Sequence, residues 1–237
     1  MSTQHISYTV DGQQYVGYLA VGGGPGRRPA VLVCHTGTGL GPHTRHVTER
    51  LADIGYVAFA LDLYGNGAPI EVQQVDSKIQ SLKADAPRLQ RIAEAGLSVL
   101  LARPETDVNR VAAIGYCFGG SVALELARSG ANLRAVAAFH AGLSRISQVA
   151  PKKISASVLA MVGGSDPHLS VHERTTFEQE MDEAGADWRM TIYGGAEHGF
   201  TNPESSTRGI SGLSYSAQAD ERSWREMLDL FGEVLDG

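Results

Sequence analysis

The chain has 237 residues, of which 43% are hydrophobic and 19% are charged, and its formal net charge is -6. This balance is ordinary for a globular protein and excludes a disordered polyelectrolyte. An acidic chain has no electrostatic attraction to a phosphate backbone, so the sequence predicts no nucleic-acid partner. No Pro/Gly/Ser-rich linker or charge run divides the chain, so we expect a single domain over residues 1–237.

The first residues show no charged segment that leads into an apolar stretch, so no secretory signal is predicted. No apolar run approaches the roughly 18 residues that a membrane span needs, and no membrane partner is expected. The chain has two cysteines, Cys34 and Cys117, too few for a disulfide framework. These features predict a cytoplasmic protein.

The predicted elements begin with two alternating segments, residues 5–10 and 15–20, around the turn-forming pair Asp11-Gly12. Short apolar runs then predict buried strands, and an alternating run predicts the last strand; they cover residues 30–34, 56–61, 111–114, 133–139, 158–162 and 188–193. Helical patterns lie between them, at residues 43–54, 86–103, 121–128, 171–184 and 218–234.

Asp85 is predicted to cap the helix that starts at residue 86, and residues 68–86 otherwise suggest a loop with a short helix near residues 78–83. Buried strands that alternate with helices are typical of a mostly parallel sheet. We therefore expect an α/β fold with an antiparallel N-terminal hairpin and helices on both faces of the sheet.

The segment Gly115-Tyr116-Cys117-Phe118-Gly119-Gly120 stands between a predicted strand and a predicted helix. A nucleophile-type residue with a glycine two positions away on each side is typical of a nucleophile elbow. The turn is so tight that a Cβ at either flanking position would collide with backbone. Cys117 would then lie at the helix N-terminus, where N–H groups favour a thiolate. The alternative is that Cys117 is a packing residue, which would need none of these glycines.

Two further residues follow strands at the carboxyl edge of the predicted sheet, where sites of such folds gather. Asp166 comes after the strand at residues 158–162, and His198 comes after the last strand. Taken alone, Asp166 is a turn cap and His198 is a surface residue. The order nucleophile, Asp, His is that of the α/β-hydrolases.

This order predicts a division of roles. His198 would take the proton of the Cys117 thiol, and Asp166 would hold the tautomer and orientation of the imidazole. Backbone N–H groups would stabilise the oxyanion, one from Phe118 and one from the loop near Thr36 or Gly37.

With Asp62-Leu63-Tyr64-Gly65, Gly164-Ser165-Asp166-Pro167 and residues 193–200, these motifs resemble the dienelactone hydrolases (carboxymethylenebutenolidases) over nearly the whole chain. The resemblance implies a single-domain α/β-hydrolase that needs no cofactor, with Cys117, Asp166 and His198 as its triad. It leaves the substrate open, because the members of this family are diverse.

The chain departs from the family pattern at two positions. Where the family commonly has a glutamate that holds the resting cysteine, this chain has Thr36, which cannot accept a thiol proton at neutral pH. Where dienelactone-cleaving members have an arginine that grips the substrate carboxylate, this chain has Asn202. A carboxylated dienelactone is therefore not expected as the substrate, although Arg208 in the same loop is an alternative cation.

The expected substrate pocket is lined by residues near the strand ends, namely His35, Thr36, Tyr64, Phe200 and Asn202. Other histidines suggest a metal: His35, His43 and His46 are close in sequence, and His168 and His172 are four residues apart, with His168 expected at the start of a helix. No Cys, Asp or Glu completes a recognised metal spacing with them, so no metal site is predicted. His140 is expected to be a hydrogen-bonded structural histidine.

These features predict a cysteine-dependent hydrolase that cleaves an ester, lactone or thioester bond of a small molecule through an acyl-enzyme. Thr36 leaves open a ligand-binding or sensor protein with a degenerate site. Acyl transfer to an acceptor other than water is a third alternative. The sequence does not separate a monomer from a small homo-oligomer.

Overall fold

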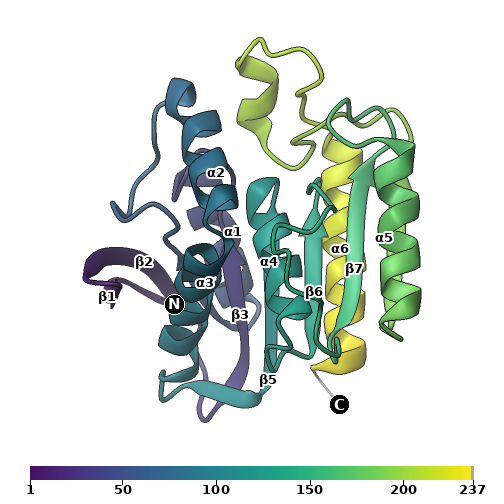
Figure 1. Ribbon diagram of the computed structural model, residues 1–237. Helices are drawn as coiled ribbons and strands as arrows, with labels where there is room; N and C mark the ends of the chain where they lie inside the picture. Colours follow the sequence, from purple (N-terminus) through teal and green to yellow (C-terminus); the bar gives the residue numbers. More distant parts are fainter. Residues whose placement is uncertain (236–237) are drawn as a thin grey trace.

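The computed structural model describes residues 1–235 and contains one eight-stranded sheet in the order β1-β2-β4-β3-β5-β6-β7-β8 (Figure 1). β1 is antiparallel to β2, and β2 is antiparallel to β4, whereas all other neighbours are parallel. The strands are β1 (Ser2–Val10), β2 (Gln13–Val21), β3 (Arg28–Cys34), β4 (Val57–Leu61), β5 (Thr106–Tyr116), β6 (Ala135–Phe139), β7 (Ser157–Gly163) and β8 (Trp188–Tyr193).

The expected hairpin joins β1 to β2 through Asp11 and Gly12, whose φ angles of 49° and 77° are both positive. Positive φ at both central residues is the requirement of a type I′ turn, which Asp-Gly pairs favour. The predicted mostly parallel sheet with an antiparallel N-terminal hairpin is confirmed.

Helices cover both faces of the sheet, as the sequence predicts (Figure 1). They are α1 (Pro42–Asp53), α2 (Val75–Ala84), α3 (Ala86–Leu101), α4 (Phe118–Arg128), α5 (Val171–Glu183) and α6 (Ala217–Val234), with short 3₁₀ helices η1 (Val72–Gln74) and η2 (Pro203–Thr207). Buried side chains of α3, α4 and α5 belong to the hydrophobic cluster on one face, and those of α1 and α6 belong to the cluster on the other. Asp85 caps α3 as expected, because its carboxylate accepts a hydrogen bond from the backbone N–H of Arg88.

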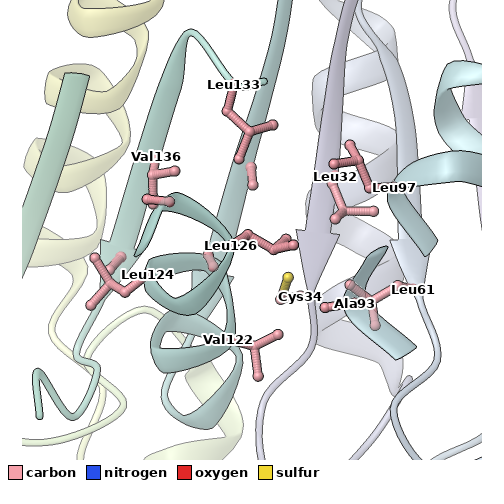
Figure 2. Packing of buried hydrophobic residues seen from close by; sticks show 14 of the residues in the cluster. Leu32, Cys34, Leu61, Ala93, Leu97, Val122, Leu124, Leu126, Leu133 and Val136 are labelled. Carbon is pink, nitrogen blue, oxygen red and sulfur yellow. The ribbon is translucent and has the colours of Figure 1, made fainter. Parts of the chain in front are cut away.

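Cys34 ends β3 inside the first of these clusters. Figure 2 shows its sulfur between Val122 and Leu126 of α4 on one side and Leu61 and Ala93 on the other. The side chain is fully buried, and this burial raises the pKa of its thiol. Cys34 is therefore a packing residue, the ordinary role of a buried cysteine.

Several elements differ in extent from the sequence-based expectation. β5 begins at Thr106 instead of residue 111, because its polar first residues extend the pairing with β3 past an irregularity between Arg28 and Ala30. α2 is longer than the predicted residues 78–83. The loop after β8 contains η2, which Asn202 caps by accepting a hydrogen bond from the N–H of Glu204.

No helix in residues 1–235 is both long enough and apolar enough to cross a bilayer. At the upper end of the molecule in Figure 1, where α4 begins, α2 and the loop after β8 rise beyond the carboxyl edge of the sheet. That edge carries the candidate active site.

Candidate active site

The elbow has the strained geometry that its glycines predict. Cys117 joins β5 to α4 with φ 55° and ψ -121°, a left-handed conformation that is costly for a residue with a side chain. A Cβ on Gly115 would lie 2.0 Å from the carbonyl oxygen of Gly119, and a Cβ on Gly119 would lie 2.2 Å from that of Cys34. The strand and the helix therefore approach so closely that only glycine fits at both positions.

The structure brings the three predicted triad residues together. His198 Nε2 lies 3.1 Å from Cys117 Sγ, and His198 Nδ1 lies 2.8 Å from Asp166 Oδ2. The backbone N–H of His168 donates to the other oxygen of the buried Asp166 carboxylate at 2.8 Å. With its Nδ1–H given to Asp166, the imidazole has Nε2 available for the thiol proton, which is the tautomer that a general base needs.

The electrostatics of this arrangement favour charge separation. Burial alone would raise the pKa of the Cys117 thiol, but the hydrogen bond and the charge of His198 lower it overall. Burial likewise would lower the pKa of His198, but its hydrogen bonds with the Asp166 carboxylate and the Cys117 sulfur raise it overall. Each partner therefore stabilises the charged form of the other, as in a thiolate–imidazolium pair.

Two backbone N–H groups also act on the sulfur. They belong to Phe118 and Gly37, the two residues predicted to supply the oxyanion hole, and both lower the pKa of Cys117. A carbonyl carbon attacked by this sulfur would have its oxygen close to the same N–H groups. These groups could therefore stabilise the charge that develops on that oxygen. One donor comes from the first turn of α4, and the other comes from the loop after β3.

The loop with Gly37 is held by the segment that follows β4. Tyr64 donates its hydroxyl hydrogen bond to the carbonyl oxygen of Gly37 at 2.8 Å, and Ile70 N–H donates to the carbonyl of Thr38 at 2.9 Å. Tyr64, expected as a pocket aromatic, is buried, and its hydroxyl holds the loop after β3 that carries Gly37, the predicted oxyanion loop.

Asp62 explains why the segment Asp62-Leu63-Tyr64-Gly65 has its shape. Its buried carboxylate accepts hydrogen bonds from the N–H groups of Val16, Tyr64, Gly65 and Gly67, over distances of 2.8–3.1 Å. A carboxylate satisfied by several N–H donors fixes the surrounding turn. It thereby fixes the backbone position from which the Tyr64 side chain extends.

His35 does not line a pocket as the sequence suggested. Its ring is fully buried, its Nδ1 lies 2.7 Å from the carbonyl oxygen of Thr36, and its Nε2 accepts from the N–H of Leu63 at 3.1 Å. Both ring nitrogens are thus used by backbone, and the side chain connects the loops after β3 and β4. Burial lowers its pKa, which keeps the ring neutral for both hydrogen bonds.

Thr36, expected at the position of the family glutamate, has its hydroxyl 2.8 Å from that of Thr38. Together with Asn202, Arg208 and His43 it lines a cavity of about 120 Å³, and neither Cys117 nor His198 is among the described residues that line it. Arg208 forms an ion pair with Glu204 at 3.3 Å. The predicted pocket residues Thr36 and Asn202 therefore share a cavity that is separate from the triad. Arg208 also lines this cavity, and its charge is paired with Glu204.

Phe200 is also placed differently from the prediction. It is fully buried and packs its ring against Tyr193 and His140, with centroids 5.4 Å and 5.1 Å away. Phe200 is therefore a core residue, and its ring is not accessible to a substrate. The predicted aromatic lining of a pocket by Phe200 is wrong for this reason.

Two histidines flank His198. His140 is buried, with φ 40°, and its Nε2 lies 2.9 Å from the hydroxyl of Thr201, so the expected hydrogen bond is confirmed. Its ring centroid is 5.3 Å from that of His198, while the exposed His168 lies edge-on at 5.1 Å. Burial, and then the charge of His198, lower the pKa of His140 well below its ordinary value.

The prediction that His168 begins a helix is wrong, because α5 begins at Val171 after the cap residue Ser170. His168 and His172 therefore do not share a helical face. In residues 1–235 no group of three or more His, Cys, Asp or Glu side chains is arranged to hold a metal ion. No sequence signal pointed to the packing of His140 and His168 against His198, since it depends on how three loops meet.

Comparisons with known proteins agree with this architecture. The sequence profile of the Dienelactone hydrolase family matches residues 16–235. A protein of Synechocystis named "Putative carboxymethylenebutenolidase" is 28% identical over 94% of this chain and 93% of its own length.

Two solved structures are more similar. The structure of m3DLH is 38% identical, covers 99% of this chain and 98% of its own, and superposes with a TM-score of 0.92. A dienelactone hydrolase-like promiscuous phosphotriesterase, P91, from metagenomic libraries is 36% identical over 98% of both chains, with a TM-score of 0.93. These similarities and the strand order identify the architecture as the α/β-hydrolase fold.

Proposed function

The chain belongs to the dienelactone hydrolase family, and we propose that it is a cytoplasmic, cofactor-independent hydrolase whose nucleophile is Cys117. Its substrate would be a small molecule with an ester, lactone or thioester bond, and the whole chain would act as one catalytic domain. The observation that carries the proposal is the position of His198, within 3.1 Å of the Cys117 sulfur and 2.8 Å of the Asp166 carboxylate.

The reaction would begin with attack of the Cys117 thiolate on the substrate carbonyl carbon. The oxygen that becomes negative would accept hydrogen bonds from the N–H groups of Phe118 and Gly37. As the tetrahedral intermediate collapses, the bond to the leaving group breaks and the His198 imidazolium gives it a proton. A thioester to Cys117 remains.

Hydrolysis of that thioester would use His198 again. The neutral imidazole takes a proton from water, the hydroxide adds to the thioester carbonyl, and the Cys117 thiolate leaves as the acid product forms. Asp166 stays ionised throughout and stabilises the imidazolium. Nucleophile, base and orienting carboxylate together support this cycle.

The first experiment compares the purified parent with Cys117→Ala and Cys117→Ser on a panel of p-nitrophenyl esters, lactones and thioesters. We expect Cys117→Ala to lose at least about 10³-fold in kcat/KM, since removal of a nucleophile leaves only binding and oxyanion stabilisation. Intact-mass spectrometry of quenched parent should show an acyl adduct that maps to Cys117. Parent-like turnover by Cys117→Ala would reject the proposal.

The same panel separates the other activities. Stoichiometric binding of a ligand with no turnover of any ester, lactone or thioester would indicate a sensor protein instead. Product analysis with an added alcohol or amine would reveal acyl transfer, because the acyl group would then appear on the added acceptor and not on water.

A second candidate activity is phosphotriester cleavage, favoured by the 36% identity to P91 over 98% of both chains. The Cys117 thiolate would attack phosphorus and expel an aryloxide, and water would later release the phosphodiester. Release of p-nitrophenol from paraoxon, measured in parent and Cys117→Ala, tests it. An equal rate in the two proteins would exclude this activity from the site.

A further inference from the structure

The helix α2 lies against the oxyanion loop and is unlike the other helices that surround the site. Leu82 is its only buried residue, and Val75 and Ile79 are half-buried in an otherwise polar sequence. Residues four apart on a helix share one face. The helix therefore presents a single apolar face, and its remaining surface is exposed.

That apolar face meets the loop at the oxyanion donor. A Cβ on Gly37 would lie 3.0 Å from Val75 Cγ1 and 3.0 Å from Ile79 Cδ1. Both methyl groups thus stand within a few ångströms of the residue whose N–H acts on the Cys117 sulfur. A substrate whose carbonyl oxygen is held by Gly37 would have its own substituents next to these side chains.

Packing in the core leaves the side chains of Val75 and Ile79 partly exposed. Ile79 packs against the cluster on the α3 and α4 face, whereas Val75 is outside the described members of both clusters. The neighbouring Asp76 and Lys78 are exposed. Apolar groups that remain half-exposed beside a reactive centre are available to a ligand.

We propose that Val75 and Ile79 form an apolar binding site for the uncharged hydrocarbon chain of the acyl group. The inference rests on the proposed function, because it takes Gly37 as the oxyanion donor. The leaving group must lie near His198 Nε2 to receive its proton, so the acyl chain is the substituent left for the side of the oxyanion loop. An uncharged chain buries these methyl groups favourably, whereas a carboxylate there would lose its hydration.

The experiment measures kcat/KM for p-nitrophenyl acetate, butanoate and hexanoate in the parent, Val75→Ala, Ile79→Ala and Ile79→Phe. Each methylene that contacts apolar surface contributes up to about 4-fold. We expect the ratio of butanoate to acetate to fall about 5-fold in Ile79→Ala, with acetate changed less than 2-fold. Ile79→Phe places a larger apolar side chain on the helix face, leaves less room for a long acyl chain and should instead disfavour hexanoate.

Leu82→Ala is the matched control, because it truncates a buried residue of the same helix that faces the core. It should lower thermal stability and leave the butanoate to acetate ratio as in the parent. Equal loss on all three esters in Ile79→Ala, or the same ratio change in Leu82→Ala, would overturn the inference.

A final comparison tests the charge preference with p-nitrophenyl pentanoate and mono-p-nitrophenyl glutarate, which differ by a terminal carboxylate. The parent should prefer pentanoate by about 10-fold or more, and a preference for glutarate would overturn the inference. Cys117→Ala is measured alongside. Residual parent-like turnover there would reject the proposed function itself, whereas a dead Cys117→Ala with chain-length ratios unaffected by Ile79 would reject the α2 site alone.

Discussion

The two sides of the candidate site are built differently. On the nucleophile side, Cys117 is fixed by α4, all eleven residues of which are buried, and by glycines pressed against neighbouring backbone. On the oxyanion side, Gly37 is held by one tyrosine hydroxyl, a few backbone hydrogen bonds and a helix with a single buried residue. Cys117 therefore rests on rigid core, while the proposed oxyanion donor Gly37 rests on a thin, partly exposed layer.

This difference predicts that the largest stability effects lie on the nucleophile side. A Cβ in Gly119→Ala would meet the carbonyl oxygens of Cys34 and His35 at 2.2 Å and 2.3 Å, and neither backbone group can move without disturbing β3. We expect a loss of about 3 kcal/mol or more in the free energy of unfolding, measured by urea denaturation.

Gly232→Ala in α6 is the matched control for that substitution. An added Cβ there meets no atom within 4 Å, so the change should stabilise the helix by about 0.5–1 kcal/mol. Equal urea midpoints for the two variants would show that the elbow is not held by close backbone packing.

The same contrast explains what could be predicted from the sequence. The elbow was predictable because its glycines, its cysteine and the flanking strand and helix lie within one short segment. Asp166 and His198 followed because parallel strands end at one edge of a sheet, so chain order largely determines what meets there. These expectations depend on local pattern and topology alone.

The surroundings of the triad could not be predicted in this way. His35 and Phe200 follow strands as expected, yet their rings turn into the core. Residues far along the chain complete their contacts there, Leu63 for His35 and His140 for Phe200. Val75 and Ile79 are one apolar pair four residues apart, a pattern too short to predict that these side chains would contact the loop with Gly37. Loop orientation decides such contacts, and it depends on long-range packing.

A smaller effect is expected on the oxyanion side. Tyr64→Phe removes the hydroxyl that holds the Gly37 carbonyl and leaves that buried acceptor unsatisfied. We expect kcat to fall about 10-fold with KM changed less than 2-fold, since the donor is needed most when charge develops. The free energy of unfolding should fall by only about 1 kcal/mol.

Tyr18→Phe supplies the control, because it removes a hydroxyl that bonds Glu49 of α1 on the other face of the sheet. It should leave kcat unchanged. An equal loss of kcat in Tyr18→Phe and Tyr64→Phe would mean that Tyr64 does not position the oxyanion loop in particular.

The most direct test of the central claim is the pH dependence of Cys117 alkylation by iodoacetamide, in the parent and in His198→Ala. Only the thiolate reacts, and the buried Cys34 supplies little background, which Cys117→Ala measures. His198 lowers the pKa of Cys117 against the opposing effect of burial, so the inflection for the parent should lie below the ordinary thiol range near pH 8.5.

Without His198, burial dominates again and the pKa of Cys117 should rise to its ordinary value or above. The inflection of the alkylation profile should therefore move to higher pH, and the rate at pH 6.5 should fall at least about 10-fold. An inflection at the same pH in His198→Ala and in the parent would contradict the account.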